Sequence, residues 1–346
     1  MKKKHDYQKN MRVFVTGGAG YIGSHTCLKL LESEYDVYVI DNLSNGHVIA
    51  LDRVQNICNR NLTFLNADIR DSNALDQVFK SFKPHAVIHF AGLKAVADSV
   101  INPLRYYDVN VNGSINLLNA MERACCSNIV FSSSATVYGD PVYLPYDELH
   151  PTDPINPYGR SKLMIEEIIR DWVSVNKDRK GISLRYFNPI GAHQSGHIGE
   201  DPNGPPNNLM PYISQVAAGR RKLLKIFGNS YDTSDGTGSR DYIHVLDLAN
   251  AHLKALKNLS KFKDFEIFNI GCGSGVTVLN LVNAFEKATK VSINYEFAPK
   301  RDGDLGAFWA DSSRSNKLLN WKPEFDIDRM CIDTWRWQQN NLDGYK

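Results

Sequence analysis

The sequence predicts an α/β protein with a doubly wound parallel sheet of the Rossmann type and a smaller mixed α/β lobe. From Met11 onward, short runs of β-branched or aromatic residues alternate with amphipathic stretches, and a glycine-rich turn follows the first run. After Asn188 the elements become shorter, and a long loop rich in Gly, Pro and Asn intervenes. Strands that alternate with helices are typical of parallel sheets covered on both faces.

The size and composition of the chain suit a protein with a large buried core. It has 346 residues, of which 42% are hydrophobic, and a formal net charge of +2. Its basic start, residues 1–10, has no apolar stretch like that of a secretory signal. No later run approaches the roughly 18 apolar residues that span a bilayer. We therefore expect a cytoplasmic protein with no membrane partner.

Charge and cysteine usage favour a small-molecule ligand. The charge is nearly balanced, and the one basic cluster, GRRKLLK at 219–225, is interpreted as a solvated helix end, so no nucleic-acid partner is expected. The six cysteines lack CxxC spacing, which favours free thiols over disulfides or a metal site.

The first half of the chain supplies the predicted sheet. Strands are expected in MRVFVTG, DVYVID, AVIHFAG, NIVFSSS and ISLRYFN, which begin at residues 11, 36, 86, 128 and 182. The stretch SHTCLKLLES at 24–33 is expected to form a helix between the first two strands. Residues 103–124 and 158–176 have the pattern of two long helices.

The second half supplies the smaller lobe. Short strands are expected in KIFG, EIFNIG and VSINYEF, which begin at 225, 266 and 291, and a helix in VLDLANAHLKAL at 245–256. We interpret residues 1–10 as an N-terminal extension, 11–187 as a nucleotide-binding lobe and 188–346 as a substrate-binding lobe, with some exchange of segments.

A dinucleotide site is predicted at VTGGAGYIGSH, residues 15–25. Gly17, Gly20 and Gly23 stand directly after a strand and at the start of a helix. Such a turn brings backbone close to phosphate oxygens and aims a helix N-terminus at a pyrophosphate. The spacing Gly-x-x-Gly-x-x-Gly is the variant found in short-chain dehydrogenase/reductase proteins. An ordinary strand-to-helix turn is the alternative.

Asp41, at the end of the next strand, strengthens this interpretation. A carboxylate there can accept hydrogen bonds from an adenosine ribose and would repel a 2′-phosphate, so NAD is favoured over NADP. A second glycine-rich stretch, GCGSG at 271–275, has the wrong spacing and no acid after a following strand. We interpret it as a plain turn.

A catalytic pair is predicted in NPYGRSK, residues 156–162. Asn156 can cap a helix and Pro157 suits its first position, so Tyr158 and Lys162 fall one turn apart on one face. A tyrosine has an ordinary pKa of about 10, but a nearby ammonium, a helix N-terminus and a cationic nicotinamide would stabilise its phenolate. Such a tyrosine could take a proton from an alcohol during oxidation. An exposed tyrosine beside a solvated lysine is the alternative.

Three hydroxyls at the end of a predicted strand, in FSSSATVYG, add to the site. Open α/β sheets bind ligands at the carboxyl ends of their strands. Ser134 is therefore expected to hydrogen-bond the reacting oxygen.

Motifs along the whole chain after residue 10 resemble the UDP-glucose 4-epimerases (UDP-galactose 4-epimerases) of the extended short-chain dehydrogenase/reductase family. These motifs are MRVFVTGGAGYIGSHT, DNLSNG, VIHFAGLKAV, FSSSATVYGD, NPYGRSK, LRYFNPIGAH, PNNLMPYI, GSRDYIHVLDLA, RDGDL and DTWRWQ. The match is specific because it covers both halves of the chain.

The resemblance implies a role for each residue of the site. The catalytic residues would be Ser134, Tyr158 and Lys162. The NAD site would comprise, besides these three and the glycines, Tyr21, Ile22, Asp41, Asn42, Leu43, Ser44, Asn45, Asp68, Ile69, Phe90, Ala91, Gly92, Lys94 and Phe187. The sugar nucleotide would contact Lys94, Ser134, Thr136, Tyr158, Asn188, Asn208, Leu209, Lys225, Ile226, Phe227, Arg240, Arg301, Asp304 and Phe308. Arg240 and Arg301 carry planar forks suited to a diphosphate, or are two surface ion-pair arginines.

The implied reaction is the reversible C4 epimerisation of UDP-glucose and UDP-galactose through a transient 4-keto sugar. NAD would be tightly bound and not consumed, with Tyr158 as general base and acid. The family also implies a homodimer formed through the helices at 103–124 and 158–176. Phe308 stands where relatives active on acetylated sugars tend to have a small residue, so poor activity on UDP-N-acetylglucosamine is expected; alternatively, Phe308 is a core aromatic beside Trp309.

Three other functions on the same fold are rivals. A nucleotide-sugar 4,6-dehydratase would carry an Asp-Glu pair where this chain has Ala135 and Thr136, which cannot shuttle the proton of that elimination. A non-enzymatic NAD sensor typically lacks the Tyr and Lys pair. A simple dehydrogenase that releases its cofactor stays open as an alternative.

Overall fold

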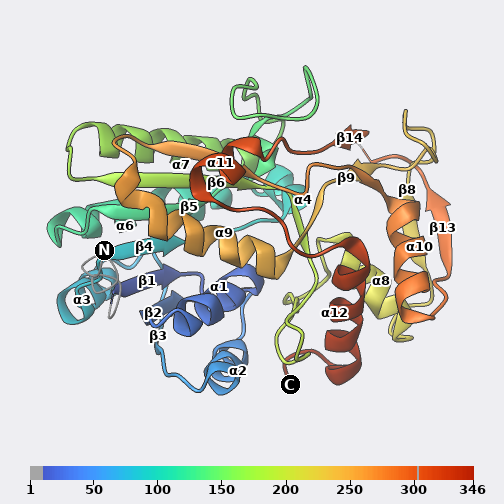
Figure 1. The fold of residues 1–346 in the computed structure, drawn as a ribbon, viewed down its shortest axis with the longest axis horizontal. Coiled ribbons are helices and arrows are strands. Elements are labelled where there is room, and N and C mark those ends of the chain that lie inside the picture. The colour runs from blue at the N-terminus through green and yellow to red at the C-terminus, as the bar shows by residue number, and fades with distance from the viewer. Residues whose placement is uncertain (1–10, 302–303) are drawn as a thin grey trace. The chain divides into compact units, whose positions relative to one another are not determined.

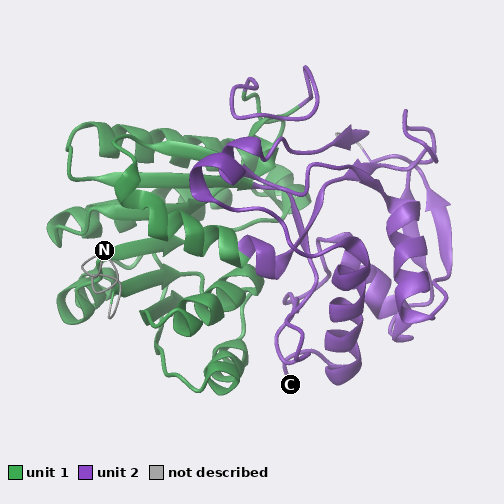
Figure 2. Ribbon diagram, in the orientation of Figure 1, with its two compact units in different colours: residues 1–139, 152–185, 249–268 green, residues 140–151, 186–248, 269–346 purple. Residues whose placement is uncertain are grey.

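The structure is a computed structural model that describes residues 11–301 and 304–346. The N-terminal extension expected at 1–10 therefore lies outside the described residues. The chain divides into two compact units, coloured separately in Figure 2. Unit 1 comprises residues up to 139 with 152–185 and 249–268, and unit 2 comprises 140–151, 186–248 and 269–346.

Unit 1 is built on a seven-stranded sheet with the order β11-β6-β5-β4-β1-β2-β3 (Figure 1). Its strands are β1 (Arg12–Thr16), β2 (Asp36–Asp41), β3 (Thr63–Asn66), β4 (Ala86–His89), β5 (Asn128–Ser132), β6 (Lys180–Tyr186) and β11 (Glu266–Ile270). The five neighbouring pairs from β6 to β3 are all parallel. The predicted doubly wound parallel sheet is thus confirmed, and the strand order reverses between β1 and β4, where such sheets bind ligands.

Helices cover both faces of this sheet. The helices and turns of this part of the chain are α1 (Tyr21–Glu32), α2 (Val48–Cys58), α3 (Ser72–Phe82), α4 (Val96–Ile101), α5 (Pro103–Tyr106), the π-helical η2 (Tyr107–Asn112), α6 (Gly113–Arg123), the short 3-10 turn η3 (Ala135–Val137), α7 (Pro157–Ser174), α9 (Val245–Asn258) and the 3-10 turn η4 (Leu259–Lys261). Figure 1 shows α1 and α9 on one face, and buried residues of α3, α6 and α7 pack on the other. The long helix predicted at 103–124 is found as α5, η2 and α6 in succession, and the one at 158–176 as α7.

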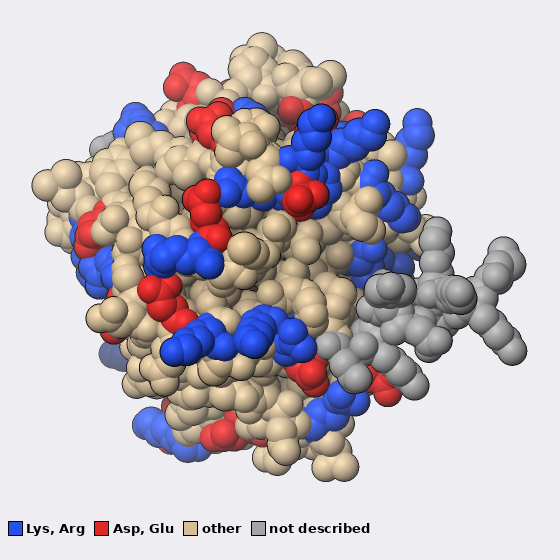
Figure 3. All heavy atoms as spheres, turned by 90° about the vertical axis from the view of Figure 1, so that its left-hand side faces the viewer, with Lys and Arg blue, Asp and Glu red and all other residues tan. Residues whose placement is uncertain are grey.

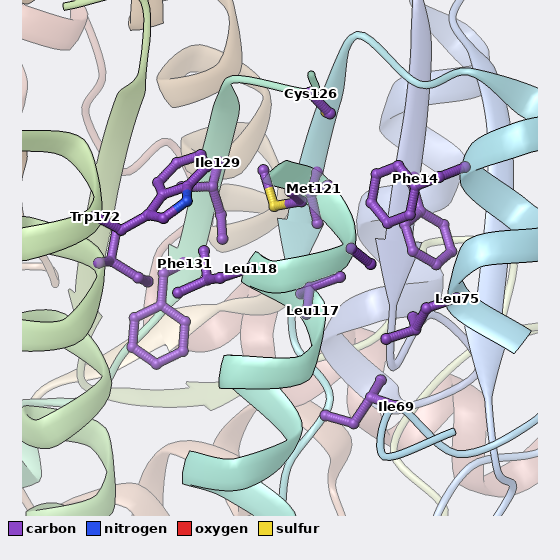
Figure 4. Close-up of a cluster of buried hydrophobic side chains, with 14 of the residues drawn as sticks. Phe14, Ile69, Leu75, Leu117, Leu118, Met121, Cys126, Ile129, Phe131 and Trp172 are labelled. Atoms are coloured by element: carbon purple, nitrogen blue, oxygen red, sulfur yellow. The ribbon is translucent and has the colours of Figure 1, made fainter. Parts of the chain in front are cut away.

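The core of unit 1 lies between the sheet and the helices of that second face. Figure 4 shows Leu117, Leu118 and Met121 of α6 between Trp172 of α7 and Phe14 of β1. The strands contribute alternate residues because successive side chains point to opposite faces of a sheet. The helix α3 enters this layer with a well-formed start, since the Asp71 side chain accepts hydrogen bonds from two of its backbone N–H groups.

Unit 2 contains small sheets and several helices, as predicted for a mixed α/β lobe. The sheets pair β10 with β7, β9 with β12 and β14, and β13 with β8. The strands are β7 (Asn188–Ile190), β8 (Leu224–Phe227), β9 (Ser239–Arg240), β10 (Tyr242–His244), β12 (Val276–Thr277), β13 (Tyr295–Ala298) and β14 (Ala307–Phe308). The helices are α8 (Leu209–Ala217), α10 (Val278–Thr289), α11 (Ser313–Leu319) and α12 (Ile327–Asn340), and α8, α10 and α12 share one apolar core.

The two units exchange segments that follow no simple boundary in the sequence. The stretch EIFNIG, expected in the smaller lobe, forms the edge strand β11 of the seven-stranded sheet. Residues 140–151 join unit 2, where the backbone N–H of Tyr146 donates to the carbonyl of Trp309 at 2.9 Å. A short apolar run does not specify which sheet it joins, because the same alternation of side chains suits an edge of either sheet.

Charges of both signs are interspersed on the surface. Figure 3 shows Lys and Arg side chains next to Asp and Glu on the face that it presents, with no extended field of one sign. The six cysteines are free thiols. Across the described ranges, no helix combines the length and apolar character needed to cross a membrane.

Candidate active site

The glycine loop after β1 takes the form that its spacing predicts. Gly17 has a φ of +72°, and a Cβ on it would lie 2.6 Å from the backbone N of Ala91. A Cβ on Gly23 would lie 2.3 Å from the carbonyl oxygen of Gly17. Gly20 is the N-cap of α1 and has no side chain with which to cap it. The loop therefore presents bare backbone and a helix N-terminus at the carboxyl end of β1.

Asp41 stands beside this loop. Its Oδ2 accepts the N–H of Ala19 at 3.0 Å and its Oδ1 accepts the N–H of Leu43 at 2.9 Å. Burial raises the pKa of Asp41 above its ordinary value, and the two backbone N–H groups oppose that shift. Each carboxylate oxygen can accept a further hydrogen bond, so Asp41 can still bind a ribose.

Two further groups of predicted cofactor residues come together at the ends of β2 and β3. The Nδ2 of Asn42 donates to Oδ2 of Asp68 at 2.9 Å. The guanidinium of Arg70 lowers the pKa of Asp68 to about 2, so this carboxylate is ionised at neutral pH. Ile69 is buried against Gly113, whose missing side chain makes room for it.

The loop after β4 is held by Asn110, a residue that sequence reasoning missed. The backbone N–H of Leu93 donates to Oδ1 of Asn110 at 2.7 Å, and Nδ2 of Asn110 donates to the Leu93 carbonyl at 3.0 Å. The same Nδ2 donates to Oγ of Ser161, which in turn donates to the carbonyl of Tyr158. Asn110 thus fixes the predicted NAD residues Phe90 to Lys94 and also the first turn of α7. The sequence offered no signal for it, because the stretch 103–124 contains several other asparagines.

The helix α7 begins as its sequence predicts. The side chain of Asn156 accepts the N–H of Gly159 at 2.9 Å, and Pro157 occupies the first turn. Tyr158 and Lys162 are only 6% and 4% exposed. The alternative of an exposed tyrosine beside a solvated lysine is therefore wrong. A Cβ on Gly159 would lie 2.7 Å from the carbonyl oxygen of Thr136, so this glycine lets the helix approach the segment that carries Ser134.

Lys162 extends from α7 to the end of β5. Its Nζ donates to the carbonyl of Ser132 at 2.8 Å and lies 6.0 Å from the centre of the Tyr158 ring. Burial lowers the pKa of Lys162 to about 8, and the charge of Glu166 acts in the opposite direction. The lysine is therefore mostly a cation at neutral pH, close enough to Tyr158 to favour a phenolate.

Ser134 caps the 3-10 turn η3 and is oriented by it. Its Oγ accepts the backbone N–H of Thr136 at 3.2 Å and the hydroxyl of Thr136 at 3.0 Å. Both bonds use the oxygen as an acceptor, which leaves the hydroxyl proton for donation to a ligand. The neighbouring Ala135 is buried and offers no acid.

In unit 2, Asp304 joins the two predicted diphosphate arginines. Arg240 contacts its Oδ1 at 2.9 Å, and Arg301 contacts its Oδ2 through Nη2 at 2.7 Å. The guanidinium of Arg240 stacks on the ring of Phe308 at 4.6 Å, and that of Arg301 on Phe227 at 4.9 Å. The arginines are thus placed in one cluster. Asp302 and Gly303 of the RDGDL motif lie outside the described residues.

The other predicted residues of unit 2 differ in what they can offer a ligand. The Oδ1 of Asn188 is buried and has no hydrogen-bond partner among the described residues. Asn208 donates to Glu200 at 2.6 Å at the start of α8, where Leu209 follows. Lys225 is exposed, but the side chain of Ile226 is buried in the core, so Ile226 can contact a ligand only through its backbone. Phe187 packs against Phe308, with ring centres 6.0 Å apart.

The stretch GCGSG, interpreted as a plain turn, binds an acid of the chain itself. Asp241 accepts the N–H groups of Cys272 at 2.7 Å, Gly273 at 2.9 Å and Ala310 at 3.1 Å. Burial raises the pKa of Asp241 to about 6. Two of the backbone donors that this turn could offer a phosphate are therefore already used. Asp241 was missed from the sequence, although it directly follows Arg240.

A doubly wound sheet with a glycine loop at its switch point, and a buried Tyr and Lys pair on one helix, define an enzyme of the short-chain dehydrogenase/reductase class. Comparison with known proteins identifies the family within this class. The family described as GDP-mannose 4,6 dehydratase matches residues 14–334. The UDP-glucose 4-epimerase of Bacillus subtilis is 51% identical over 336 residues, covering 97% of this chain and 99% of the relative. That of Homo sapiens is 53% identical over 341 residues, covering 96% and 98%.

Similar solved structures point to the same family as these relatives. A UDP-glucose 4-epimerase from Stenotrophomonas maltophila, crystallised with NAD and formylated UDP-arabinopyranose, has a TM-score of 0.94 and 45% identity, over 96% of this chain and 99% of that one. One from Bifidobacterium longum, with NAD+ and UDP, has a TM-score of 0.93 and 45% identity, over 96% and 100%. The chain therefore belongs to the UDP-glucose 4-epimerase family, and the family predicted from its motifs is confirmed.

Proposed function

We propose that this protein interconverts UDP-glucose and UDP-galactose by inverting C4 through a transient 4-keto sugar. The observation that carries the proposal is the buried pair of Tyr158 and Lys162, one turn apart on α7, in a chain of the epimerase family. When bound, NAD would supply the redox chemistry by holding the hydride that C4 loses on oxidation and regains on reduction. No net redox change results.

The residues of unit 1 fit NAD. Gly17 and Gly23 leave no room for side chains where backbone must meet a pyrophosphate, and Asp41 keeps acceptor capacity for a ribose. We propose that the segments 41–45, 68–69 and 90–94 surround the adenosine and nicotinamide parts, together with Tyr21, Ile22 and Phe187. Unit 1 would then be the NAD-binding lobe and unit 2 the UDP-sugar-binding lobe.

The protein's own groups move the proton. Tyr158, as a phenolate favoured by Lys162, accepts the proton of the sugar 4-hydroxyl while C4 is oxidised, and it returns this proton when C4 is reduced from the other face. The hydroxyl of Ser134 donates to the same sugar oxygen and orients it. Tyr158 and Ser134 hold this oxygen both when C4 is oxidised and when it is reduced, so one site serves both epimers.

We propose that unit 2 binds the UDP. Arg240 and Arg301 present two guanidinium forks in one cluster with Asp304, which suits a diphosphate. Asn188 offers a buried amide oxygen, and Asn208, Leu209 and the segment 225–227 would contact the nucleotide. Most of the affinity would then come from contacts with the UDP. The keto sugar would be held loosely enough to rotate within the site.

We also propose that the active protein is a cytoplasmic homodimer formed through unit 1. Large apolar side chains are exposed on neighbouring helices: Val100 and Ile101 of α4, Leu104 of α5 and Met164 of α7. Such a group of apolar residues on a surface is typical of a protein–protein interface.

The direct test is to mix the purified protein with UDP-galactose without added cofactor and to quantify UDP-glucose. Formation of UDP-glucose, with NAD recovered from the denatured protein, supports the proposal. No UDP-glucose with or without added NAD would refute it. Release of a keto sugar with accumulation of NADH would indicate the simple dehydrogenase instead.

A further inference from the structure

A buried ion pair lies one turn beyond Lys162 on α7. Glu166 is 0% exposed, and its Oε2 is 2.5 Å from Nη2 of Arg185, whose side chain is 4% exposed. The Nε of Arg185 and the hydroxyl of Ser183 both donate to Oε1 of Glu166 at 3.0 Å. Burying two charges in a protein seldom gains net stability, so the fold alone does not account for this pair.

The pair occupies the same buried layer as the proposed catalytic groups. Glu166 follows Lys162 by four residues, which places both side chains on one face of α7. Lys162 reaches the carbonyl of Ser132 on β5, while Ser183 and Arg185 belong to β6, the strand hydrogen-bonded to β5. The carboxylate is therefore held over the strand adjacent to the one that Lys162 contacts.

Arg185, the other residue of the ion pair, contacts the segment that carries Ser134. The guanidinium of Arg185 stacks on the ring of Tyr138 at 4.8 Å, directly after the turn η3. The ion pair thus joins the segment that carries Ser134 to the helix that carries Tyr158 and Lys162. All of these residues belong to unit 1.

The ionisable groups that face Lys162 come from three elements. Tyr158 and Glu166 are on α7, Arg185 is on β6 and His89 is on β4. His89 is fully buried between Thr16, at 2.7 Å, and Ser114, at 2.9 Å. Burial, and then the charge of Lys162, lower the pKa of His89 to about 3, so this histidine is neutral. Glu166 is therefore the anion that opposes the effect of burial on Lys162.

We propose that Glu166 is a positioning residue that keeps the buried Lys162 in its charged form, and that Arg185 and Ser183 fix its carboxylate in place. Without this anion the ammonium would lose its proton at a lower pH, and the phenolate of Tyr158 would lose its nearby cation. The consequence for turnover rests on the proposed function, but the effect on Lys162 does not.

The test compares Glu166→Gln with Glu167→Gln. Glu167 is the next residue of α7, lies on the surface and pairs with the exposed Arg170, so its substitution removes the same charge without touching Lys162. Protein labelled with ¹³C at lysine Cε is titrated by NMR without substrate, and Lys162→Met assigns the signal. We expect Glu166→Gln to lower the titration midpoint of Lys162 by about one pH unit, by removal of an opposite charge. We expect Glu167→Gln to leave it unchanged.

Further variants keep the test decisive. Glu166→Asp retains the charge and should hold the midpoint close to that of the natural protein. A purely steric role would give the opposite pattern, since Gln keeps the shape of the Glu side chain and Asp is one methylene shorter. If circular dichroism shows that Glu166→Gln does not fold, the double variant Glu166→Gln with Arg185→Met is compared with Arg185→Met alone; its midpoint should be the lower of the two, because they differ only in the anion. An unchanged midpoint in folded Glu166→Gln, or equal midpoints in the double variant and Arg185→Met, overturns the proposal.

Activity supplies a second readout. The alkaline limb of the kcat/KM profile should move to lower pH in Glu166→Gln by the same amount as the Lys162 titration, while its acid limb stays in place. A uniform loss of rate at every pH would contradict the proposal. Absence of epimerase activity in the natural protein would refute the proposed function and leave the titration result standing.

Discussion

Tyr158 is positioned by the start of its helix and by the residues next to it on α7. Its backbone carbonyl is held by Ser161, its helix begins at the Asn156 cap, and Lys162 places a cation 6.0 Å from its ring. Each of these contacts is local in sequence, within one turn of α7. The stretch NPYGRSK therefore predicted the geometry of the pair correctly, whereas the burial that makes it chemically useful depends on the sheet.

Replacement of Tyr158 by Phe removes only the phenolic oxygen. Because general-base removal typically costs a factor of about 10² to 10⁴, turnover should fall by at least about two orders of magnitude. The measurement is the rate of UDP-glucose formation. Tyr143→Phe is the matched control, since Tyr143 is exposed and its hydroxyl bonds only Asp147 among the described contacts. Near-normal turnover of Tyr158→Phe would rule out its role as the base.

The charge of Lys162 is predicted to set an upper pH limit for the reaction. Burial lowers its pKa to about 8, so the ammonium is present below that pH and is lost as the pH rises through it. If the cation supports the phenolate, kcat/KM of the natural protein should decline above about pH 8. A kcat/KM profile that stays flat up to pH 10, where the protein is still folded by circular dichroism, would contradict this role.

At the scale of elements, the strands and helices of unit 1 were mostly predictable because their side-chain periods are regular. The strand β3 (Thr63–Asn66) was not predicted, because it is an edge strand with only two apolar residues and none that is buried, whereas the equally short β4 is mostly apolar and buried along its whole length. The destination of β11 was also missed, because strand pairing is decided by tertiary packing. Asn110 and the pair of Glu166 and Arg185 escaped notice for the same reason: their partners are distant in sequence.

Asp241 ties together segments of unit 2 that the sequence keeps far apart. Asp241→Asn would place an amide where Oδ2 now accepts the N–H groups of Gly273 and Ala310, or where Oδ1 accepts that of Cys272. Leaving one or two buried donors without an acceptor should lower the free energy of unfolding by about 2 kcal/mol or more. Urea denaturation measures this. The exposed Asp232 provides Asp232→Asn as a control, and equal stability of the two variants would show that the turn does not depend on Asp241.

At the scale of the whole molecule, the proposed homodimer depends on apolar residues of α4, α5 and α7. Leu104 is 80% exposed, so Leu104→Glu should leave the fold of unit 1 intact while placing a charge in the interface. Light scattering should give about twice the chain mass of 39.0 kDa for the natural protein and the single mass for the variant.

Leu149 is also a highly exposed leucine, at 89%, but lies in unit 2. Leu149→Glu is therefore the control and should remain a dimer. The proposed interface is contradicted if the natural protein is a monomer at working concentrations, or if Leu104→Glu is still a dimer.

For the whole molecule, the sequence predicted the function in more detail than it predicted which segments form each unit. The glycine loop, Asp41 and the Tyr158 pair specify only an NAD-dependent alcohol oxidation, and Ala135 with Thr136 argues against elimination of water. The narrower assignment came from motifs spread over both units, which match the family along its full length. Physical reasoning alone could not identify the sugar or its nucleotide. Both were inferred from the similarity to the family.

The central claim is that hydrogen leaves C4 of the sugar and returns to C4 within one bound complex. The most direct measurement follows UDP-galactose labelled with deuterium at C4 through its conversion by the purified protein, using NMR and mass spectrometry of the sugar nucleotide. We expect UDP-glucose with the deuterium still at C4 and none in the solvent. Loss of the label to water, or its appearance on another carbon, would contradict the account.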